Sequence, residues 1–205
     1  MKTILCFGDS NTHGFRPGIG GRFDRTQRWP GALAHLLGDG FHVVEEGLSG
    51  RTTAFEDPVT EGLCGLALIT PLMASHAPVD TLVVMLGTND TKARFGAEPT
   101  IIARGMQRLL EKALYTGAWA GKPDILLVSP APIDPGFDAL DDGDFGPGAI
   151  EKSMALAKAY AALAQTLGIR FFDAGTVVKA SPVDGVHLSA DSHRALAVAL
   201  AELLR

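Results

Sequence analysis

The sequence predicts an α/β fold, a flavodoxin-like three-layer α/β/α sandwich with about five parallel strands. Short apolar segments alternate with longer segments of helical periodicity along the whole chain. The apolar segments, such as Thr81–Leu86 (TLVVML), are hydrophobic at consecutive positions and not only at alternate ones. Strands of that kind are buried on both faces, which is typical of a parallel sheet covered by helices on each side.

Length and composition indicate a single globular domain. The chain has 205 residues, which suits one domain, residues 1–205, at ~150 residues per domain. Hydrophobic residues make up 46% of the chain and charged residues 20%, close to globular averages. This composition excludes a disordered chain, a collagen and a coiled coil.

The first four expected elements alternate between strand and helix. Lys2–Phe7 is short and apolar, and we expect a buried strand there. Trp29–Leu37 has leucines at helical spacing, and Pro30 suits the first turn of a helix. Phe41–Val44 is the second expected strand. Leu63–Met73 is ambiguous by pattern, and its length favours a helix.

The elements after the strand at Thr81–Leu86 continue this alternation. Pro99–Tyr115 has apolar residues on one helical face, and Ile125–Val128 (ILLV) is a short apolar strand. Three more elements follow: an Ala-rich helix at Ile150–Leu167, a strand at Ile169–Phe172 and a closing helix at Ala190–Leu204. Two long segments, Arg16–Arg28 and Pro130–Gly148, are expected to be loops, and long loops in compact domains tend to be functional or to form contacts.

Charge and cysteine content exclude several classes of protein. The net charge is −5, from 18 basic and 23 acidic residues, with no basic patch that would suit a nucleic-acid partner. No apolar run approaches the ~20 residues of a membrane span. The apolar stretch at the N-terminus is too short for a signal peptide, so we expect a cytoplasmic protein. Cys6 and Cys64 can form neither a disulfide framework nor a zinc site.

Two motifs contain residues suited to nucleophilic catalysis. Gly8-Asp9-Ser10 follows the first expected strand, which places a hydroxyl at the carboxyl edge of the sheet, where open α/β sheets bind ligands. Alone, this motif is also ordinary turn chemistry. Asp184 and His187 precede the last helix; an imidazole can accept a serine proton, and a carboxylate can fix its tautomer. A helix-capping loop with a surface histidine is the alternative for this pair.

Two further motifs could stabilise an oxyanion. Asn89 follows the third strand, and its amide can donate a hydrogen bond to developing negative charge. Gly50 follows the second strand and allows the backbone N–H to approach a ligand. Each motif alone also fits a plain turn. Together the four motifs supply a nucleophile, a base, its orienting carboxylate and oxyanion donors at one edge of the sheet.

The four motifs resemble the four sequence blocks of the SGNH hydrolases, the GDSL-type esterase and lipase superfamily. The matching segments span residues 7–188 in the family order: Gly8-Asp9-Ser10, Ser49-Gly50, Gly87-Thr88-Asn89-Asp90 and Asp184-Gly185-Val186-His187. Three stretches look like the bacterial arylesterase/acyltransferase branch: Glu45–Thr53, Met85–Lys92 and Phe172–Gly175.

The resemblance implies a site and an activity. Ser10 would be the nucleophile, His187 the general base and Asp184 its orienter. The backbone N–H groups of Ser10 and Gly50, with the Asn89 side chain, would form the oxyanion hole. The implied protein is a serine esterase that cleaves short-chain aryl and alkyl esters through an acyl-enzyme, with acyl transfer to alcohols or peroxide (perhydrolysis) as a further activity of the branch. No metal or other cofactor is expected.

Substrate pocket and assembly are also expectations from the resemblance. The pocket would be lined by Asn11, Phe15, Thr88, Lys92 and Val186. Asn11 stands where the family often has leucine, and Phe15 lies where the branch can have tryptophan. Relatives form homo-oligomers, and the two long loops are candidate contact surfaces. The alternatives are a carbohydrate O-acetyl esterase, a non-catalytic binding module on the same scaffold, and a flavodoxin-like nucleotide or flavin binder, for which the loop after the first strand is a poor phosphate cradle.

Other residues have more ordinary expected roles. Asp9 and Asp173 are expected to fix turns by local hydrogen bonds, and His193 to be a solvated side chain. Arg28-Trp29 is expected to pack and cap at a helix start, and the acidic run Asp138–Asp144 to be a solvated loop.

Overall fold

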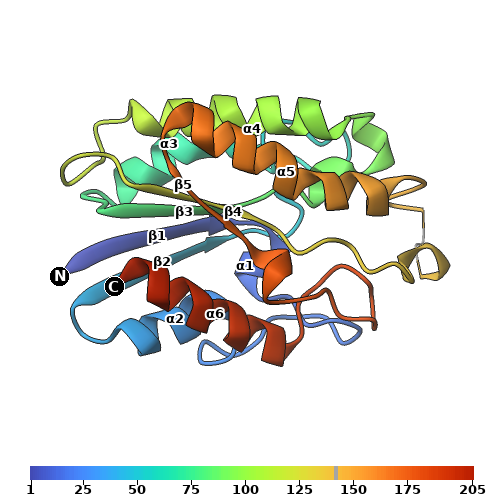
Figure 1. The fold of residues 1–205 in the computed structure, drawn as a ribbon, viewed down its shortest axis with the longest axis horizontal. Coiled ribbons are helices and arrows are strands. Elements are labelled where there is room, and N and C mark those ends of the chain that lie inside the picture. Colours follow the sequence, from blue (N-terminus) through green and yellow to red (C-terminus); the bar gives the residue numbers. More distant parts are fainter. Residues whose placement is uncertain (141–142) are drawn as a thin grey trace.

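The computed structural model describes residues 1–140 and 143–205, and within them the chain forms a parallel sheet between two layers of helices (Figure 1). The strand order is β2-β1-β3-β4-β5, with every pairing parallel, which is the flavodoxin-like order. The strands are β1 Lys2–Gly8, β2 Phe41–Gly47, β3 Thr81–Met85, β4 Ile125–Ser129 and β5 Arg170–Asp173. The predicted fold class is therefore confirmed.

The helices divide between the two faces of the sheet. Figure 1 shows α3, α4 and α5 on one side and α2 and α6 on the other. Their bounds are α1 Ser10–His13, α2 Trp29–Leu37, α3 Gly65–Ser75, α4 Pro99–Leu114, α5 Ala149–Leu167 and α6 Ala190–Leu204. Every expected strand and helix is present within a few residues of its expected bounds. Helix α1 was not expected, because four residues show no periodicity.

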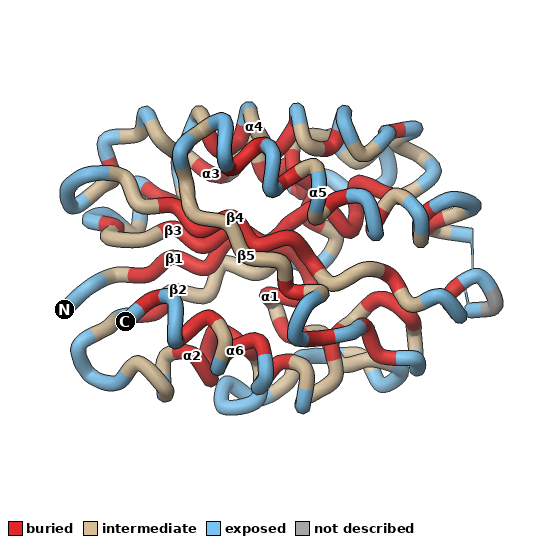
Figure 2. Tube along the Cα trace, viewed as in Figure 1, coloured by how far each residue is buried: buried red, intermediate tan, exposed pale blue. Residues whose placement is uncertain are grey.

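Alternating side chains of the strands build two separate cores. In β1, Leu5 and Phe7 pack with α3, α4 and α5, while Ile4 and Cys6 pack with α2 and α6. Figure 2 shows the central strands as the buried layer between helices whose outer faces are exposed. Cys6 is a small buried side chain of the second core, and burial raises the pKa of its thiol.

The loop Arg16–Arg28 is tied to β2 by ion pairs. Glu45 pairs with Arg22, Arg25 and Arg28, and the pair with Arg28 is also a short hydrogen bond. Arg28 occupies the N-cap position of α2 but makes no side-chain capping bond, so the expected capping by Arg28 is wrong. Its guanidinium instead fastens the loop to the sheet.

His193 is buried, contrary to the expectation of a solvated side chain. It lies in the first turn of α6 with 0% of its surface exposed, and its Nδ1 accepts a hydrogen bond from the backbone N–H of Trp29 at 3.2 Å. Burial, together with a smaller effect of the nearby His187, lowers the pKa of His193 to about 4. His193 therefore caps the N-terminus of α2 as a neutral imidazole.

The second long loop is also held by ion pairs. Asp144 pairs with Lys92 at 2.6 Å and with Arg94, so this end of the acidic run is not simply solvated. Asp141 and Asp142 of that run lie outside the described residues. Asp173 accepts a bond from the Gly175 N–H at 2.9 Å, as expected for a turn residue. Within the described ranges, no helix is both long and apolar enough to cross a membrane.

Candidate active site

Three of the four motifs follow directly after neighbouring strands. Ser10 comes after β1, Gly50 after β2 and Asn89 after β3, and these strands are adjacent in the sheet. Because the strands are parallel, their carboxyl ends meet at one edge. The fourth motif lies on the loop between β5 and α6, where Ala180 and Leu188 form an isolated bridge. This loop brings His187 to the same edge.

Ser10, His187 and Asp184 form a continuous chain of hydrogen bonds. Ser10 Oγ lies 3.0 Å from His187 Nε2, and His187 Nδ1 lies 2.8 Å from Asp184 Oδ2. The other oxygen of Asp184 accepts the backbone N–H groups of His187 at 3.0 Å and Val186 at 3.1 Å. The arrangement suits proton transfer from Ser10 to a neutral imidazole whose tautomer the carboxylate fixes.

The carboxylate of Asp184 is stabilised in its ionised form. Partial burial by itself would raise its pKa. The hydrogen bonds from the ring and backbone of His187 outweigh burial and hold the pKa below its usual range. An anion beside Nδ1 also stabilises the imidazolium that forms when His187 accepts a proton.

A short helix presents Ser10 at the sheet edge. Asp9 is the N-cap of α1, and its Oδ1 accepts the Asn11 N–H at 2.9 Å, which fixes the turn as expected. A side chain at Gly8 would collide with Thr12 and with the carbonyl of Met85, so the strand can turn here only with glycine. Burial raises the pKa of Asp9 to about 6, against the opposing effects of the Asn11 N–H, His187 and Arg51.

Asn11 holds the histidine loop and does not line the pocket. Its Nδ2 donates to the carbonyl of Val186 at 3.3 Å, and its Oδ1 accepts the Leu188 N–H at 2.9 Å. These bonds grip the backbone on both sides of His187. The expectation that Asn11 forms a polar pocket wall is therefore wrong. Its amide instead connects α1 to the His187 loop.

The expected oxyanion donors face one small cavity. A cavity of about 200 Å³ is lined by Ser10, Gly50, Asn89 and His187 together with Phe15, Ser49, Lys92, Asp144, Phe145 and Val186. Gly50 has φ +85°, a left-handed conformation that favours glycine. One N–H of the Asn89 amide donates to the Arg51 carbonyl at 3.1 Å. An amide has two such donors, so Asn89 keeps a second one for a ligand.

A wider trough adjoins this cavity. It measures about 610 Å³ and shares Phe15, Asp144, Phe145, Val186 and His187 with the smaller cavity. The ring of Phe15 lies 4.4 Å from that of His187, centroid to centroid. Phe15, Lys92 and Val186 thus line the cavity beside His187, and their contact with substrate stays a prediction.

Thr88 does not line either cavity. It is buried, and its carbonyl accepts a hydrogen bond from the Thr91 hydroxyl at 2.7 Å. Its expected place in the pocket is therefore wrong. Thr88 helps to fold the turn that carries Asn89.

Arg51 is a buried cation that sequence reasoning did not single out. Its Nη1 donates to the carbonyl of Gly8 at 2.9 Å and to the carbonyl of Glu46, and its guanidinium lies 4.2 Å from the Phe7 ring. Burial lowers the pKa of Arg51 to about 10, and Glu46 and Asp9 oppose this shift. Arg51 thereby joins the ends of β1 and β2 beneath the site. The signal in the sequence that could have identified Arg51 was its position directly after the Ser49-Gly50 motif.

The described residues contain no group of three or more His, Cys, Asp or Glu side chains that could hold a metal ion. The groups available for chemistry at this edge are a hydroxyl, an imidazole, a carboxylate and hydrogen-bond donors. Such a set can carry out acyl transfer through a serine nucleophile.

The chain is similar to known hydrolases in both sequence and structure. Residues 6–195 match the sequence pattern of the GDSL-like lipase/acylhydrolase family. The structure is similar to that of Est24, a carbohydrate acetylesterase from Sinorhizobium meliloti, with 41% identity, a TM-score of 0.94 and coverage of 100% of this chain and 98% of that one. The aryl esterase of M. smegmatis gives 42% identity, a TM-score of 0.93 and coverage of 100% and 99%. A carbohydrate acetylesterase family member from Sinorhizobium meliloti has 37% identity and a TM-score of 0.92, and the match covers 100% of this chain and 98% of that one. No curated protein sequence matches the chain.

Proposed function

The chain belongs to the GDSL-like lipase/acylhydrolase family, and from that premise we propose that it is a serine esterase of short-chain acyl esters. The observation that carries the proposal is the chain of hydrogen bonds from Ser10 through His187 to Asp184, which opens onto a cavity lined by Gly50 and Asn89. Solved structures of arylesterases and carbohydrate acetylesterases share its fold and more than a third of its sequence.

In the proposed mechanism, Ser10 Oγ attacks the ester carbonyl carbon while His187 Nε2 accepts the hydroxyl proton. The carbonyl π bond opens to an oxyanion, which accepts hydrogen bonds from the backbone N–H groups of Ser10 and Gly50 and from the Asn89 amide. When the tetrahedral intermediate collapses, the alcohol leaves with the proton from His187. Water then attacks the acyl-enzyme by the same route and releases the acid.

The size of the inner cavity suits a short acyl group. At about 200 Å³ it is smaller than the usual range of ~300–1,000 Å³ for small-molecule pockets. Phe145 is one of the residues that line both this cavity and the trough. We therefore assign the acyl group to the inner cavity and the alcohol to the trough.

A carbohydrate O-acetyl esterase is the second candidate. The trough has room for a sugar ring, and the aromatic side chains Phe15, Phe137 and Phe145 line it. Aromatic faces suit the apolar faces of pyranose rings as well as aryl groups. Acyl transfer to an alcohol or to peroxide would use the same acyl-enzyme, with that molecule in the trough in place of water.

The test compares wild-type protein with Ser10→Ala on p-nitrophenyl acetate, p-nitrophenyl octanoate and acetylated xylan. We expect the wild type to hydrolyse the acetate ester and Ser10→Ala to lose that activity without a change in melting temperature. Faster release of acetate from xylan than from the aryl ester would favour the carbohydrate candidate. Equal background rates in both proteins would contradict the esterase and favour a binding module on the same scaffold.

A further inference from the structure

Asp90 is a fully buried carboxylate for which the proposed mechanism has no use. It follows Asn89 in the turn after β3, and its exposed surface is 0%. No ion pair of Asp90 with a lysine, arginine or histidine is found within residues 1–140 and 143–205. Burial raises its pKa to about 7, although hydrogen bonds from Thr53 lower it. A buried acid without a counter-ion costs stability, so its partners indicate what it contributes.

Both carboxylate oxygens of Asp90 bind a single residue, Thr53. The Thr53 N–H lies 2.9 Å from Oδ1 and 3.1 Å from Oδ2, and the Thr53 hydroxyl donates to Oδ1. The contact is tightly enclosed by α4, where a Cβ at Gly105 would lie 2.7 Å from the Thr53 hydroxyl oxygen. Thr53 therefore has little freedom to shift relative to the β3 turn.

The neighbouring residue Asn89 holds the same loop at a second point. Its amide donates to the carbonyl of Arg51 at 3.1 Å. Adjacent residues of the β3 turn thus bind the loop at positions 51 and 53, directly after Gly50. Arg51 in turn ties this loop to the carbonyl of Gly8, two residues before Ser10. The three oxyanion donors lie on three strand ends that these bonds connect.

We propose that Asp90 is a positioning residue that fixes the Gly50 loop against the Asn89 turn and so sets the spacing of the oxyanion donors. This inference rests on the proposed esterase activity. Donors must lie about 2.7–3.1 Å from the oxyanion to stabilise it, and a misplacement of ~1 Å can cost about 10²-fold in rate. Asp90 itself touches no substrate. Its effect passes through Asn89 and Gly50.

The experiment measures kcat, KM and melting temperature for wild type, Asp90→Ala, Asp90→Asn and Thr53→Val with p-nitrophenyl acetate. We expect Asp90→Ala to lower kcat by about 10–100-fold and to change KM by less than ~3-fold. Asp90→Asn keeps an acceptor for the Thr53 N–H and should recover part of that loss. Thr53→Val keeps the shape of the side chain but removes the hydroxyl donor, so it should lower kcat less than Asp90→Ala does. This variant still tests the proposal if Asp90→Ala does not fold.

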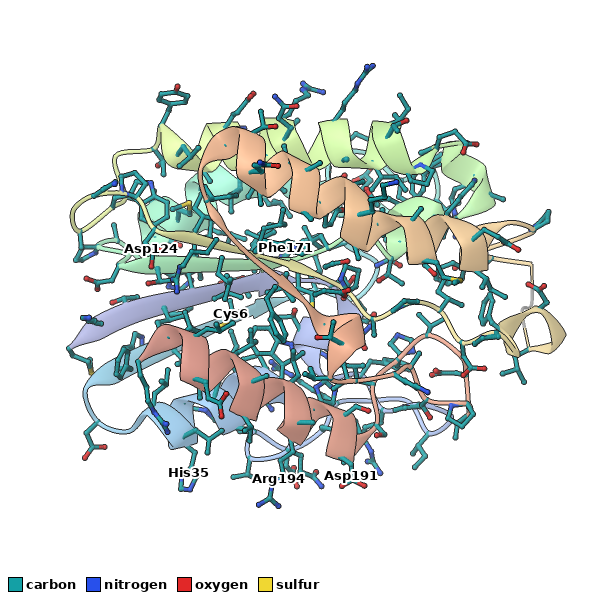
Figure 3. The ribbon with its side chains drawn as sticks, viewed as in Figure 1. Cys6, His35, Asp124, Phe171, Asp191 and Arg194 are labelled. Carbon is teal, nitrogen blue, oxygen red and sulfur yellow. The ribbon has the colours of Figure 1, made fainter. Side chains whose placement is uncertain are left out.

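Asp124→Ala is the matched control. Asp124 also accepts a threonine hydroxyl, from Thr81 at 2.8 Å, but it precedes β4 and lies at the opposite edge of the sheet (Figure 3). A purely structural role for Asp90 predicts that both alanine variants lower the melting temperature while kcat stays near wild type. A positioning role predicts the loss of kcat in Asp90→Ala alone.

A double-mutant cycle with Asn89→Ala identifies the route of the effect. If Asp90 acts through the oxyanion donors, the fold-decrease in kcat caused by Asp90→Ala should be several-fold smaller in the Asn89→Ala background than in wild type. A folded Asp90→Ala with kcat within ~2-fold of wild type would overturn the proposal, and so would full additivity with Asn89→Ala. Absence of turnover in the wild type, or undiminished turnover in Ser10→Ala, would instead contradict the esterase itself.

Discussion

The Nε2 atom of His187 lies within hydrogen-bond distance of Ser10 Oγ, at 3.0 Å, although the two residues are 177 positions apart in the sequence. Neither residue reaches the other by local structure. Ser10 is placed by the central strand β1 and its turn, whereas His187 is placed by a loop that Asn11 grips on both sides. Four predictions follow from the way in which this contact and its surroundings are built.

Asp184→Asn should lower kcat on p-nitrophenyl acetate by roughly 10³-fold or more, because an amide can hold His187 in the wrong tautomer and cannot stabilise the imidazolium. The backbone bonds that Asp184 accepts from Val186 and His187 can be kept by the amide oxygen, so the fold should persist. Steady-state kinetics with circular dichroism checks both points. Asp138→Asn, an exposed acid elsewhere, is the control, and equal rates in the two variants would argue against the role of Asp184.

Asn89→Ala should lower kcat by about 10²–10³-fold with little change in KM, since the amide stabilises the oxyanion more than the ground state. Gln107→Ala removes an amide from α4, where it binds Glu111, and should leave both constants unchanged. A rise in KM alone for Asn89→Ala would mean that this side chain only binds substrate.

Phe145→Ala should shift the preference towards longer acyl chains, because it opens the inner cavity into the trough. Each buried CH₂ of the longer chain gains ~0.8 kcal/mol. We expect the ratio of kcat/KM for octanoate to that for acetate to rise at least ~5-fold. Ile19→Ala truncates an exposed side chain that lines only the trough and should leave the ratio near wild type. An unchanged ratio in Phe145→Ala would contradict the assignment of the acyl group to the inner cavity.

His193→Asn should remove a contribution to stability that is lost on acidification. The pKa of His193 is about 4 in the fold, below its usual 6.5, so only the unfolded chain takes up this proton between those pH values. The contribution of His193 to the free energy of unfolding therefore falls as pH drops below 6.5, by ~2 kcal/mol from pH 7 to pH 5 at ~1.4 kcal/mol per pKa unit. The asparagine oxygen can accept the Trp29 N–H without titrating.

Urea denaturation at pH 7 and pH 5 measures this effect as a difference between variant and wild type. The comparison with wild type is needed because burial raises the pKa of Asp9 and Asp90, so the contributions of these two groups to stability rise on acidification. Both proteins share these contributions, and they cancel in the difference. His35→Asn alters an exposed histidine on the outer side of α2 and should keep the wild-type slope (Figure 3). If His193→Asn also kept the wild-type change in free energy of unfolding between pH 7 and pH 5, His193 would not be the group that causes it.

The fold was predictable because its signals are local. The run TLVVM of β3 and the proline in the first turn of α2 lie within the elements that they define. The grouping of the candidate site residues was predictable because three of them follow strands, and parallel strands bring their ends together. His193 was the avoidable error. It shares the buried face of α6 with Ala197, Leu200 and Leu204, so the helical period itself places it inside.

The remaining errors concern the directions and partners of side chains. Thr88 and Asn11 are sequence neighbours of site residues, but adjacency does not say where a side chain points. Asn11 binds the backbone of the His187 loop, and Thr88 is buried in the turn after β3. Arg51 and Asp90 take their roles from bonds to residues far along the chain. No periodicity or spacing in the sequence indicates such bonds.

The connection that Asn11 makes to the His187 loop has a consequence for biosynthesis. Ser10, Gly50 and Asn89 lie in the part of the chain that precedes α4, whereas His187 and Asp184 lie just before α6. In the proposed mechanism, a nascent chain that has not yet reached residues 184–188 carries Ser10 without a base to activate it. Hydrolysis therefore requires that the His187 loop has been synthesised and has docked onto Asn11.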